Sequence, residues 1–261
     1  MGIEIFRPLG VGGISPNINI TPNRYQTSFG NYLSEDTFHR SGPDKYTSEA
    51  ALKKMILANP KINRILKSSD IPLVLNMKDF KSLLANHATE TQNIAMGISS
   101  NLPFSLRTKV NEKALKEAAY LHDIGKVLIP AKILNKNGKL DAKETEIMHK
   151  HSELGYELLR TTDIDPITLN LVRNHHQNAK KTGYPWVNKD FYADINLQIL
   201  STADKYSALT EKRAYKEPMD AKQALTIIYQ DVKEGKLNPI VFKALVNYAN
   251  SNNEKLNIQR A

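Results

Sequence analysis

The sequence has no cysteine among its 261 residues. Disulfide bonds and thiolate-bound metals are therefore excluded, and a metal ion would have to be held by histidine nitrogen and carboxylate oxygen. The sequence also lacks long apolar runs, and its first residues show no basic region followed by the apolar stretch of a signal peptide. These absences predict a soluble, cytoplasmic protein without a membrane segment.

Acidic residues are the scarcer charge, because 27 Asp and Glu are outnumbered by 36 Lys and Arg, which gives a net charge of +9. This excess favours polyanionic partners such as nucleotides. The basic residues are nevertheless spread along the chain, so the composition makes no strong case for nucleic-acid binding. Hydrophobic residues make up 41% of the chain, which is enough for a sizeable core.

The predicted fold class is all-α, because strand-like alternation is scarce in the main part of the chain. Residues 1–46 are rich in Gly, Pro, Asn and Ser without a helical period, and are expected to form a disordered or loosely packed leader. Residues 47–75 carry short apolar helical patterns broken by Pro60 and Pro72, which indicates a short helical prefix. The main domain is expected to span residues 76–255.

Five helical segments of the main domain each place a polar residue on an apolar face. The first, residues 77–100, carries His87 on its apolar stripe. The second, residues 112–124, carries His122 on its apolar side and is followed by Gly125, which is typical of a glycine just past a helix end. Both histidines are therefore expected to face the core.

The remaining three segments follow the same rule. The third begins at Asp141 with the pattern of a capping box and carries His151 on its inner face. The fourth begins with Asp165-Pro166, an N-cap followed by proline, and leads into His175-His176. The fifth places Asp204 in register with its apolar residues. Each segment thus brings an imidazole or a carboxylate to the interior.

A single histidine on an apolar face is usually a core residue with its hydrogen bonds satisfied. A set of such groups is different, because burying them together is costly without a cation to compensate. A carboxylate next to a histidine can bridge two metal ions, and a bridged pair activates water for attack on phosphorus. His39 and His149 are left out, the latter because it is rotated off the face that carries His151. The predicted ligands of a two-metal phosphohydrolase site are His87, His122, Asp123, His151, His175, His176 and Asp204.

The sequence resembles the HD-domain phosphohydrolases, and more closely their HD-GYP branch, which hydrolyses cyclic di-GMP. The resemblance covers residues 84–248 and rests on several motifs in order at family-like spacing. They are residues 119–130 (AYLHDIGKVLIP), 133–136 (ILNK) with 138–140 (GKL), 151–159 (HSELGYELL), His175-His176, Gly183-Tyr184-Pro185, Ala203-Asp204 with 208–210 (ALT), and 213–215 (RAY).

This resemblance implies an HD-domain helical bundle with the same seven metal ligands, of which Asp123 would be the bridge. It implies catalytic roles for Asp123, Lys126 and Arg213, and substrate contacts from Lys126, Arg213, Lys216 and Tyr184. The expected reaction is attack of a metal-bridging hydroxide on a phosphorus of a cyclic dinucleotide, most of all cyclic di-GMP. Two divalent ions are expected, and Fe(II) or Mn(II) suit a nitrogen-rich, thiol-free ligand set.

Three departures from the family pattern bear on function. Members with a third metal carry a glutamate at the position of Leu83, so two metals are expected here. The acidic residues that follow the His-His pair are replaced by residues 177–182, where Lys180 and Lys181 invert the local charge. Ser207 takes the place of the family's second aspartate. Because the loop of residues 177–182 differs from the family pattern, the sequence does not identify the substrate.

Three functions therefore remain in competition. The first is a cyclic di-GMP phosphodiesterase, and the second is an HD phosphohydrolase for another nucleotide or phosphoester. The third is a degenerate module that binds a cyclic dinucleotide or a partner protein without hydrolysis. The complete ligand set favours the two enzymes, whereas the altered loop keeps the third open. A protein partner, if there is one, is expected to contact the loop Gly183-Tyr184-Pro185.

Overall fold

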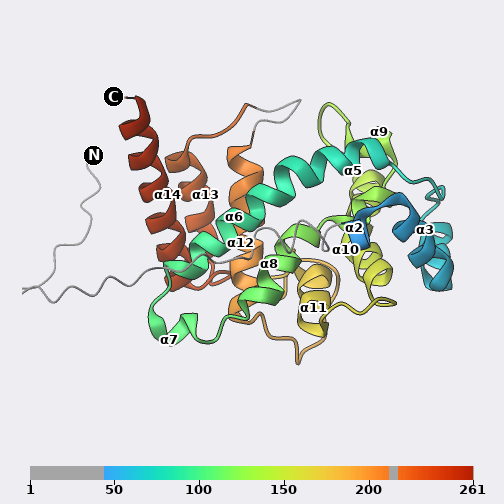
Figure 1. Ribbon diagram of the computed structural model, residues 1–261, viewed down its shortest axis with the longest axis horizontal. Coiled ribbons are helices and arrows are strands. Elements are labelled where there is room, and N and C mark those ends of the chain that lie inside the picture. Colours follow the sequence, from blue (N-terminus) through green and yellow to red (C-terminus); the bar gives the residue numbers. More distant parts are fainter. Residues whose placement is uncertain (1–43, 212–216, 261) are drawn as a thin grey trace, which may run out of the picture. The chain divides into compact units, whose positions relative to one another are not determined.

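The computed structural model of the protein describes residues 44–211 and 217–260 (Figure 1), with side chains up to residue 251. Every regular element in these two ranges is a helix, so the all-α prediction is confirmed. Residues 1–43 of the predicted leader lie outside the described residues. The last residues assigned to the leader are helical, because α2 (Asp44–Thr47) begins at Asp44 and buries Tyr46. The helical prefix thus starts earlier than predicted.

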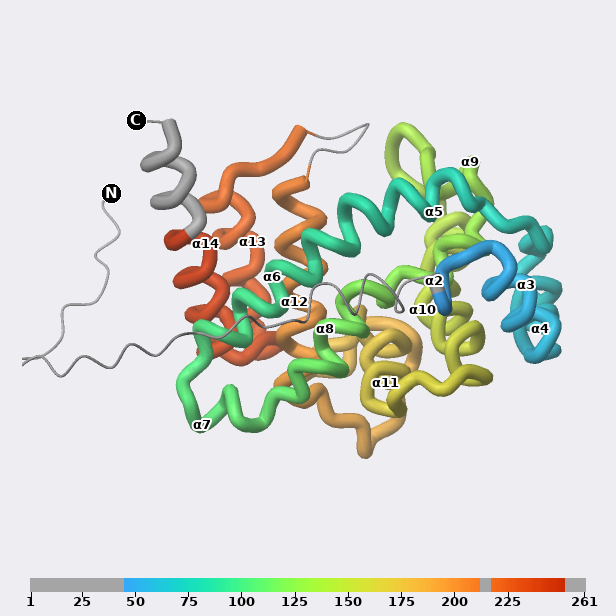
Figure 2. Tube along the Cα trace, viewed as in Figure 1, coloured from blue at the N-terminus to red at the C-terminus, as the bar shows by residue number. Residues whose placement is uncertain are grey.

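The prefix continues with two longer helices, α3 (Glu49–Ala58) and α4 (Pro60–Ser68). Asn59 joins them, since its backbone N–H closes α3 and its side chain accepts a hydrogen bond at the start of α4. Both helices lie beside α10 (Ala142–Leu159), as Figure 2 shows.

Glu157 of α10 anchors the prefix. Its carboxylate is fully buried and accepts hydrogen bonds from Asn59 Nδ2 at 2.8 Å and Lys61 Nζ at 2.7 Å. Burial alone would raise the pKa of Glu157, but the hydrogen bonds from Lys61 and Asn59 lower it. Because a buried carboxylate is stable only when paired, this contact fixes the prefix to the helix that carries His151.

We expect Asn59→Ala to lower the free energy of unfolding by about 2–4 kcal/mol, since it removes both a helix cap and a donor to a buried carboxylate. Urea unfolding followed by circular dichroism measures the change. Asn59→Ser is the control, because a serine keeps a capping oxygen but has no amide to reach Glu157. Equal stability of Asn59→Ala and the wild type would contradict the anchoring role.

The first predicted segment of the main domain is one continuous helical stretch. It consists of α5 (Met77–Leu83), a π-helical turn η1 (Leu84–Ala88) and α6 (Thr89–Ser100). The π turn contains His87, which is buried. Such single turns often occur at functional sites because they shift a side chain out of the α-helical register.

The second predicted segment ends earlier than its pattern suggested. Helix α8 (Glu112–Leu121) stops before His122, and a 3-10 turn, η2 (Ile124–Leu128), follows. Gly125 lies inside this turn, so the prediction that it closes the helix is wrong. A Cβ atom on Gly125 would meet the backbone oxygen of His151 at 1.9 Å. Glycine is needed here because η2 packs directly on α10.

The next helices begin at their predicted caps. Asp141 forms the capping box of α10, and Asp165 accepts the first N–H of α11 (Pro166–Asn174). Helix α6 lies across both α8 and α12 (Ile195–Thr210), as Figure 1 shows. Among the described helices, none has both the length and the apolar character needed to cross a membrane. The remaining helices are α7 (Phe104–Arg107), α9 (Ala131–Leu134), α13 (Ala221–Lys233) and α14 (Pro239–Arg260).

Candidate metal centre

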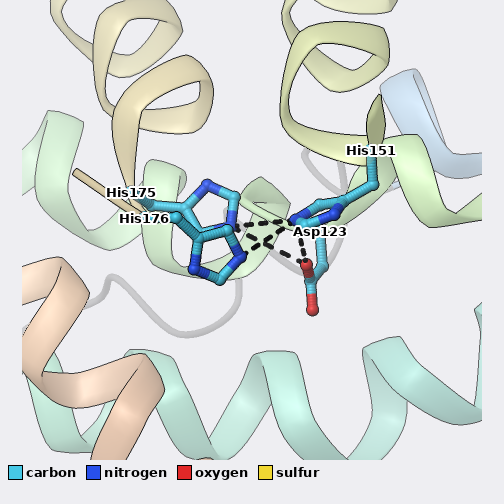
Figure 3. A group of neighbouring side chains, drawn as sticks. All are labelled: Asp123, His151, His175 and His176. Atoms are coloured by element: carbon cyan, nitrogen blue, oxygen red, sulfur yellow. Dashed lines mark hydrogen bonds and ion pairs between the residues drawn. The ribbon is translucent and has the colours of Figure 1, made fainter. Parts of the chain in front are cut away.

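The structure brings the seven predicted ligands together in two adjacent groups. Each residue of a group offers an atom that lies within 4.8 Å of the atoms offered by the others. That these atoms hold metal ions stays a prediction. The first group is Asp123, His151, His175 and His176, whose side chains point toward one another in Figure 3, and the second is His87, His122 and Asp204.

Asp123 lies between the two groups. Its Oδ1 is 3.3 Å from His151 Nε2 and 3.8 Å from His175 Nε2. Its Oδ2 is 3.3 Å from His122 Nε2 and 3.7 Å from His87 Nε2. One carboxylate oxygen therefore faces each group, which is the arrangement of a carboxylate that bridges two cations.

Backbone hydrogen bonds orient three of the histidines. The Nδ1 atoms of His122, His151 and His175 lie 2.8, 2.6 and 2.8 Å from the carbonyl oxygen three residues earlier in the chain. Donation from Nδ1 directs Nε2 at the centre, as in metal-binding histidines, and leaves Nε2 of the neutral His151 and His175 with a free lone pair. His151 Nε2 and His175 Nε2 are then only 3.2 Å apart with lone pairs facing each other, which a cation between them would relieve.

The donor set fits divalent metal ions. His122 Nε2 and Asp123 Oδ1 are buried and have no hydrogen-bond partner among the described residues. A buried polar atom without a partner costs about 1–3 kcal/mol. Imidazole nitrogen and carboxylate oxygen are ligands for Fe(II), Mn(II) and similar ions, so a cation would satisfy both atoms.

The second group attracts protons in the absence of metal. Burial lowers the pKa of His122, but the negative charges of Asp123 and Asp204 outweigh it and raise the pKa to about 10. Burial also lowers the pKa of His87, yet hydrogen bonds with Asp204 and Glu211 raise it above its ordinary value. A metal ion at this group must therefore displace a proton.

The three histidines of the first group are neutral, whereas Asp123 keeps its negative charge. Burial lowers the pKa of His151 to about 3 and that of His176 to about 4. Burial and the neighbouring imidazoles also hold the pKa of His175 well below its ordinary value. These three histidines can accept a cation without first losing a proton.

Metal binding is therefore expected to depend on pH differently at the two groups. Because His122 must release a proton, affinity at the second group should rise at least about tenfold for each pH unit between about 6 and 9, and more steeply where His87 is protonated as well. Affinity at the first group should change little over the same range. Calorimetric titration of the metal-free protein with Mn(II), in buffers of different ionisation enthalpy, measures the protons released at each step. Two binding steps with the same pH dependence would contradict the expectation.

Of the three basic residues predicted to bind the substrate, the structure describes one. Lys126 lies in η2 with its Nζ 2.5 Å from Asp123 Oδ2, and its side chain is 17% exposed. It is therefore beside the proposed bridge and still reachable. Arg213 and Lys216 lie outside the described residues.

Tyr184 lies against the histidines of the first group. Its ring is 4.5 Å from that of His176 and stacks on His149 with centroids 3.7 Å apart. Burial and the charges of Asp123 and Asp204 raise the pKa of Tyr184 above its ordinary value. The phenol therefore keeps its proton and can donate it in a hydrogen bond.

Gln177 fixes the loop that carries Tyr184. Its buried side-chain amide donates to the carbonyl of Pro185 at 2.6 Å and accepts from the N–H of Gly183 at 3.2 Å. A Cβ atom on Gly183 would meet the backbone oxygen of His176 at 1.9 Å, so the loop turns directly against the His-His pair. Gln177 can both donate and accept, which a carboxylate at this position cannot.

Sequence reasoning missed two residues that contact His87. Ser207 Oγ and Glu211 Oε2 lie 3.1 and 3.2 Å from His87 Nδ1. Both orient the imidazole from the side opposite the centre. A signal existed for Ser207, because positions 204 and 207 are three residues apart on α12 and share one face of that helix. Sequence reasoning also gave no role to His149, which supports Tyr184.

Comparison with known proteins places this chain in a family. Residues 76–241 match the HD domain family. The 3'3'-cGAMP-specific phosphodiesterase 2 of Vibrio cholerae is 40% identical over 111 residues, which cover 42% of this chain and 21% of that protein. A cyclic di-GMP phosphodiesterase of Thermotoga maritima is 35% identical over 132 residues, covering 49% of this chain and 35% of that protein.

A solved structure has the same fold. Bd1817, an HDG"Y"P protein from Bdellovibrio bacteriovorus, superposes with a TM-score of 0.50 at 17% identity, covering 81% of this chain and 66% of that chain. The chain spans about a fifth to a third of the length of the two curated relatives above. Since the family match extends over more than half of the sequence, the chain belongs to the HD domain family.

Proposed function

We propose that this chain is a metal-dependent phosphodiesterase that hydrolyses a cyclic dinucleotide. The observation that carries the proposal is the position of Asp123, which turns one oxygen to each of two groups of imidazole and carboxylate donors. A pair of divalent ions supplies a lowered pKa for water and stabilisation of the charge that develops on phosphorus. The relatives named as cyclic dinucleotide phosphodiesterases support this reaction class.

The residues around the centre have separate tasks. All seven ligands would hold the two ions, with Fe(II) or Mn(II) suited to their nitrogen-rich set. Lys126 would leave Asp123 on metal binding and hold a phosphate oxygen, since its side chain is partly exposed and its ammonium donates well to phosphate. The protonated Tyr184 would donate to the substrate beside His176. Arg213 and Lys216 are proposed as further phosphate contacts.

Cyclic di-GMP is the substrate we propose first. The sequence motifs point to this nucleotide, and several relatives are named as cyclic di-GMP phosphodiesterases, whereas other relatives are named as specific for 3'3'-cGAMP. The fixed loop at Gly183-Tyr184-Pro185 is retained beside the centre and is the proposed place for a protein partner.

Turnover under anaerobic conditions tests the proposal. The full chain is depleted of metal, loaded with Fe(II) or Mn(II), and given cyclic di-GMP, 3'3'-cGAMP, cyclic di-AMP and bis(4-nitrophenyl) phosphate. We expect two bound ions per chain and hydrolysis of at least one cyclic dinucleotide to a linear product. Absence of hydrolysis of all four diesters by the metal-loaded chain would refute an enzymatic function. Binding of cyclic di-GMP without turnover would then indicate the non-catalytic module.

A further inference from the structure

A cleft of about 420 Å³ opens beside the candidate metal centre. This size is typical of pockets that bind small molecules. The residues that line it include the two predicted ligands that are partly exposed, His176 at 25% and Asp204 at 13% of their side chains. The lining also includes the charged residues Lys205, Asp231 and Lys236. A substrate phosphate at the metal ligands would therefore have its nucleoside next to these charged side chains.

Lys205 and Asp231 form an ion pair in the lining of the cleft. Lys205 follows Asp204 on α12, whereas Asp231 comes from α13, and Lys205 Nζ lies 2.5 Å from Asp231 Oδ2. The side chains are 40% and 22% exposed, so a ligand in the cleft can reach both. An ammonium has three protons and a carboxylate two oxygens, and a single ion pair therefore leaves bonding capacity on each group.

Backbone hydrogen bonds hold the part of the cleft that carries Asp231 in place. The carbonyl oxygen of Asp231 accepts hydrogen bonds from the N–H groups of Lys236 at 2.8 Å and Leu237 at 3.2 Å. The carbonyl oxygen of Lys236 in turn accepts from the N–H of Ala179 at 3.1 Å. The end of α13 is thus tied to the segment that follows the His-His pair. Such a fixed lining can discriminate between ligands, because it does not move to fit each of them.

The side chains of Lys205 and Asp231 match the hydrogen-bonding edge of one nucleobase. Guanine presents its O6 and N7 as acceptors and its 2-amino group as a donor, together with N1–H. Asp231 can accept from the N1–H and 2-amino group, while Lys205 donates to O6. Adenine carries an amino group where guanine has O6 and a lone pair at N1, so it would face the lysine with a donor and the carboxylate with an acceptor. The ion pair is complementary to guanine and not to adenine.

We propose that Lys205 and Asp231 recognise a guanine base of the cyclic dinucleotide whose phosphate is hydrolysed at the metal centre. This inference rests on the function proposed above. Leu237 lines the same cleft and supplies an apolar contact for a face of the base. One guanine is sufficient, so cyclic di-GMP and 3'3'-cGAMP are substrates whereas cyclic di-AMP is not.

The test compares substrates within each variant of the metal-loaded full chain. Asp231→Asn and Lys205→Met are expected to lower kcat/KM for cyclic di-GMP by about 10- to 100-fold relative to kcat/KM for bis(4-nitrophenyl) phosphate, which has no base. Glu49→Gln is the matched control, because Glu49 forms an ion pair with Lys53 at 2.6 Å on the prefix, away from the residues that line the cleft. It should leave every ratio unchanged.

The outcomes distinguish this inference from the proposed function. If the wild type hydrolyses cyclic di-AMP as well as cyclic di-GMP, guanine recognition is wrong while the enzymatic function stands. Guanine recognition by these two residues is also wrong if both variants retain the wild-type ratio of kcat/KM for cyclic di-GMP to kcat/KM for bis(4-nitrophenyl) phosphate. If the metal-loaded wild type hydrolyses no diester, both proposals fail. Thermal unfolding of each variant and its turnover of bis(4-nitrophenyl) phosphate show whether the fold and the centre are intact.

Discussion

Asp123→Ala is expected to lower phosphodiester hydrolysis by about 10³-fold or more and to reduce the metal content of the protein. Both carboxylate oxygens are used, because Oδ1 faces His151 and His175 and Oδ2 faces His122 and His87. Losing them would remove one donor atom from each group at once, so neither group would keep its full set of ligands. Plasma mass spectrometry of protein purified without oxygen measures the metal, and initial rates measure turnover.

Two further variants make the result specific. Asp123→Asn keeps the size of the side chain but has a single acceptor oxygen, so we expect it to retain one ion at most. Asp163→Ala is the matched control, because Asp163 pairs with Lys45 at 2.5 Å on the surface just as Asp123 pairs with Lys126 at 2.5 Å in the centre. Wild-type metal content together with wild-type turnover in Asp123→Ala would show that the two groups of donors are not the active centre.

The convergence of the ligands could be predicted because it follows from helical periodicity. A residue that shares a face with apolar neighbours must point inward when that face packs, which is why His87 and Asp204 lie together in one group of donors and His151 lies in the other. The caps at Asp141 and Asp165 could be predicted for a similar reason, since a local side-chain hydrogen bond sets the start of the helix.

Features that depend on contacts between distant elements could not be predicted in the same way. The π turn at His87 and the stacking of His149 on Tyr184 depend on how neighbouring elements pack. The support of His87 by Glu211 also depends on packing, because the two residues come from different elements. A helix-end signal is local, and the prediction that Gly125 ends a helix rests on such a signal. Glycine is required at this position because backbone atoms of α10 lie too close for a side chain.

Gly125→Ala is expected to destabilise the fold by about 3 kcal/mol or more and to weaken metal binding. The added Cβ would lie 1.9 Å from the backbone oxygen of His151 and 2.6 Å from the backbone nitrogen of Gly155. Backbone atoms of a helix cannot rotate away as a flexible side chain does, so η2 and α10 must separate. This movement draws His151 away from Asp123, which lies two residues before Gly125 in the sequence. Thermal unfolding and metal analysis measure the two effects.

Gly155→Ala provides the comparison on the same interface. A Cβ on Gly155 would lie 3.3 Å from Gly125 nitrogen and 3.3 Å from the side chains of Ile124 and Val172, so the neighbours must yield by only a few tenths of an ångström. Alanine in a helix interior also gains about 1 kcal/mol over glycine, which offsets this crowding. We therefore expect near-wild-type stability and metal content for Gly155→Ala. If Gly125→Ala behaved in the same way, the close packing of η2 on α10 would not be what holds His151 at the centre.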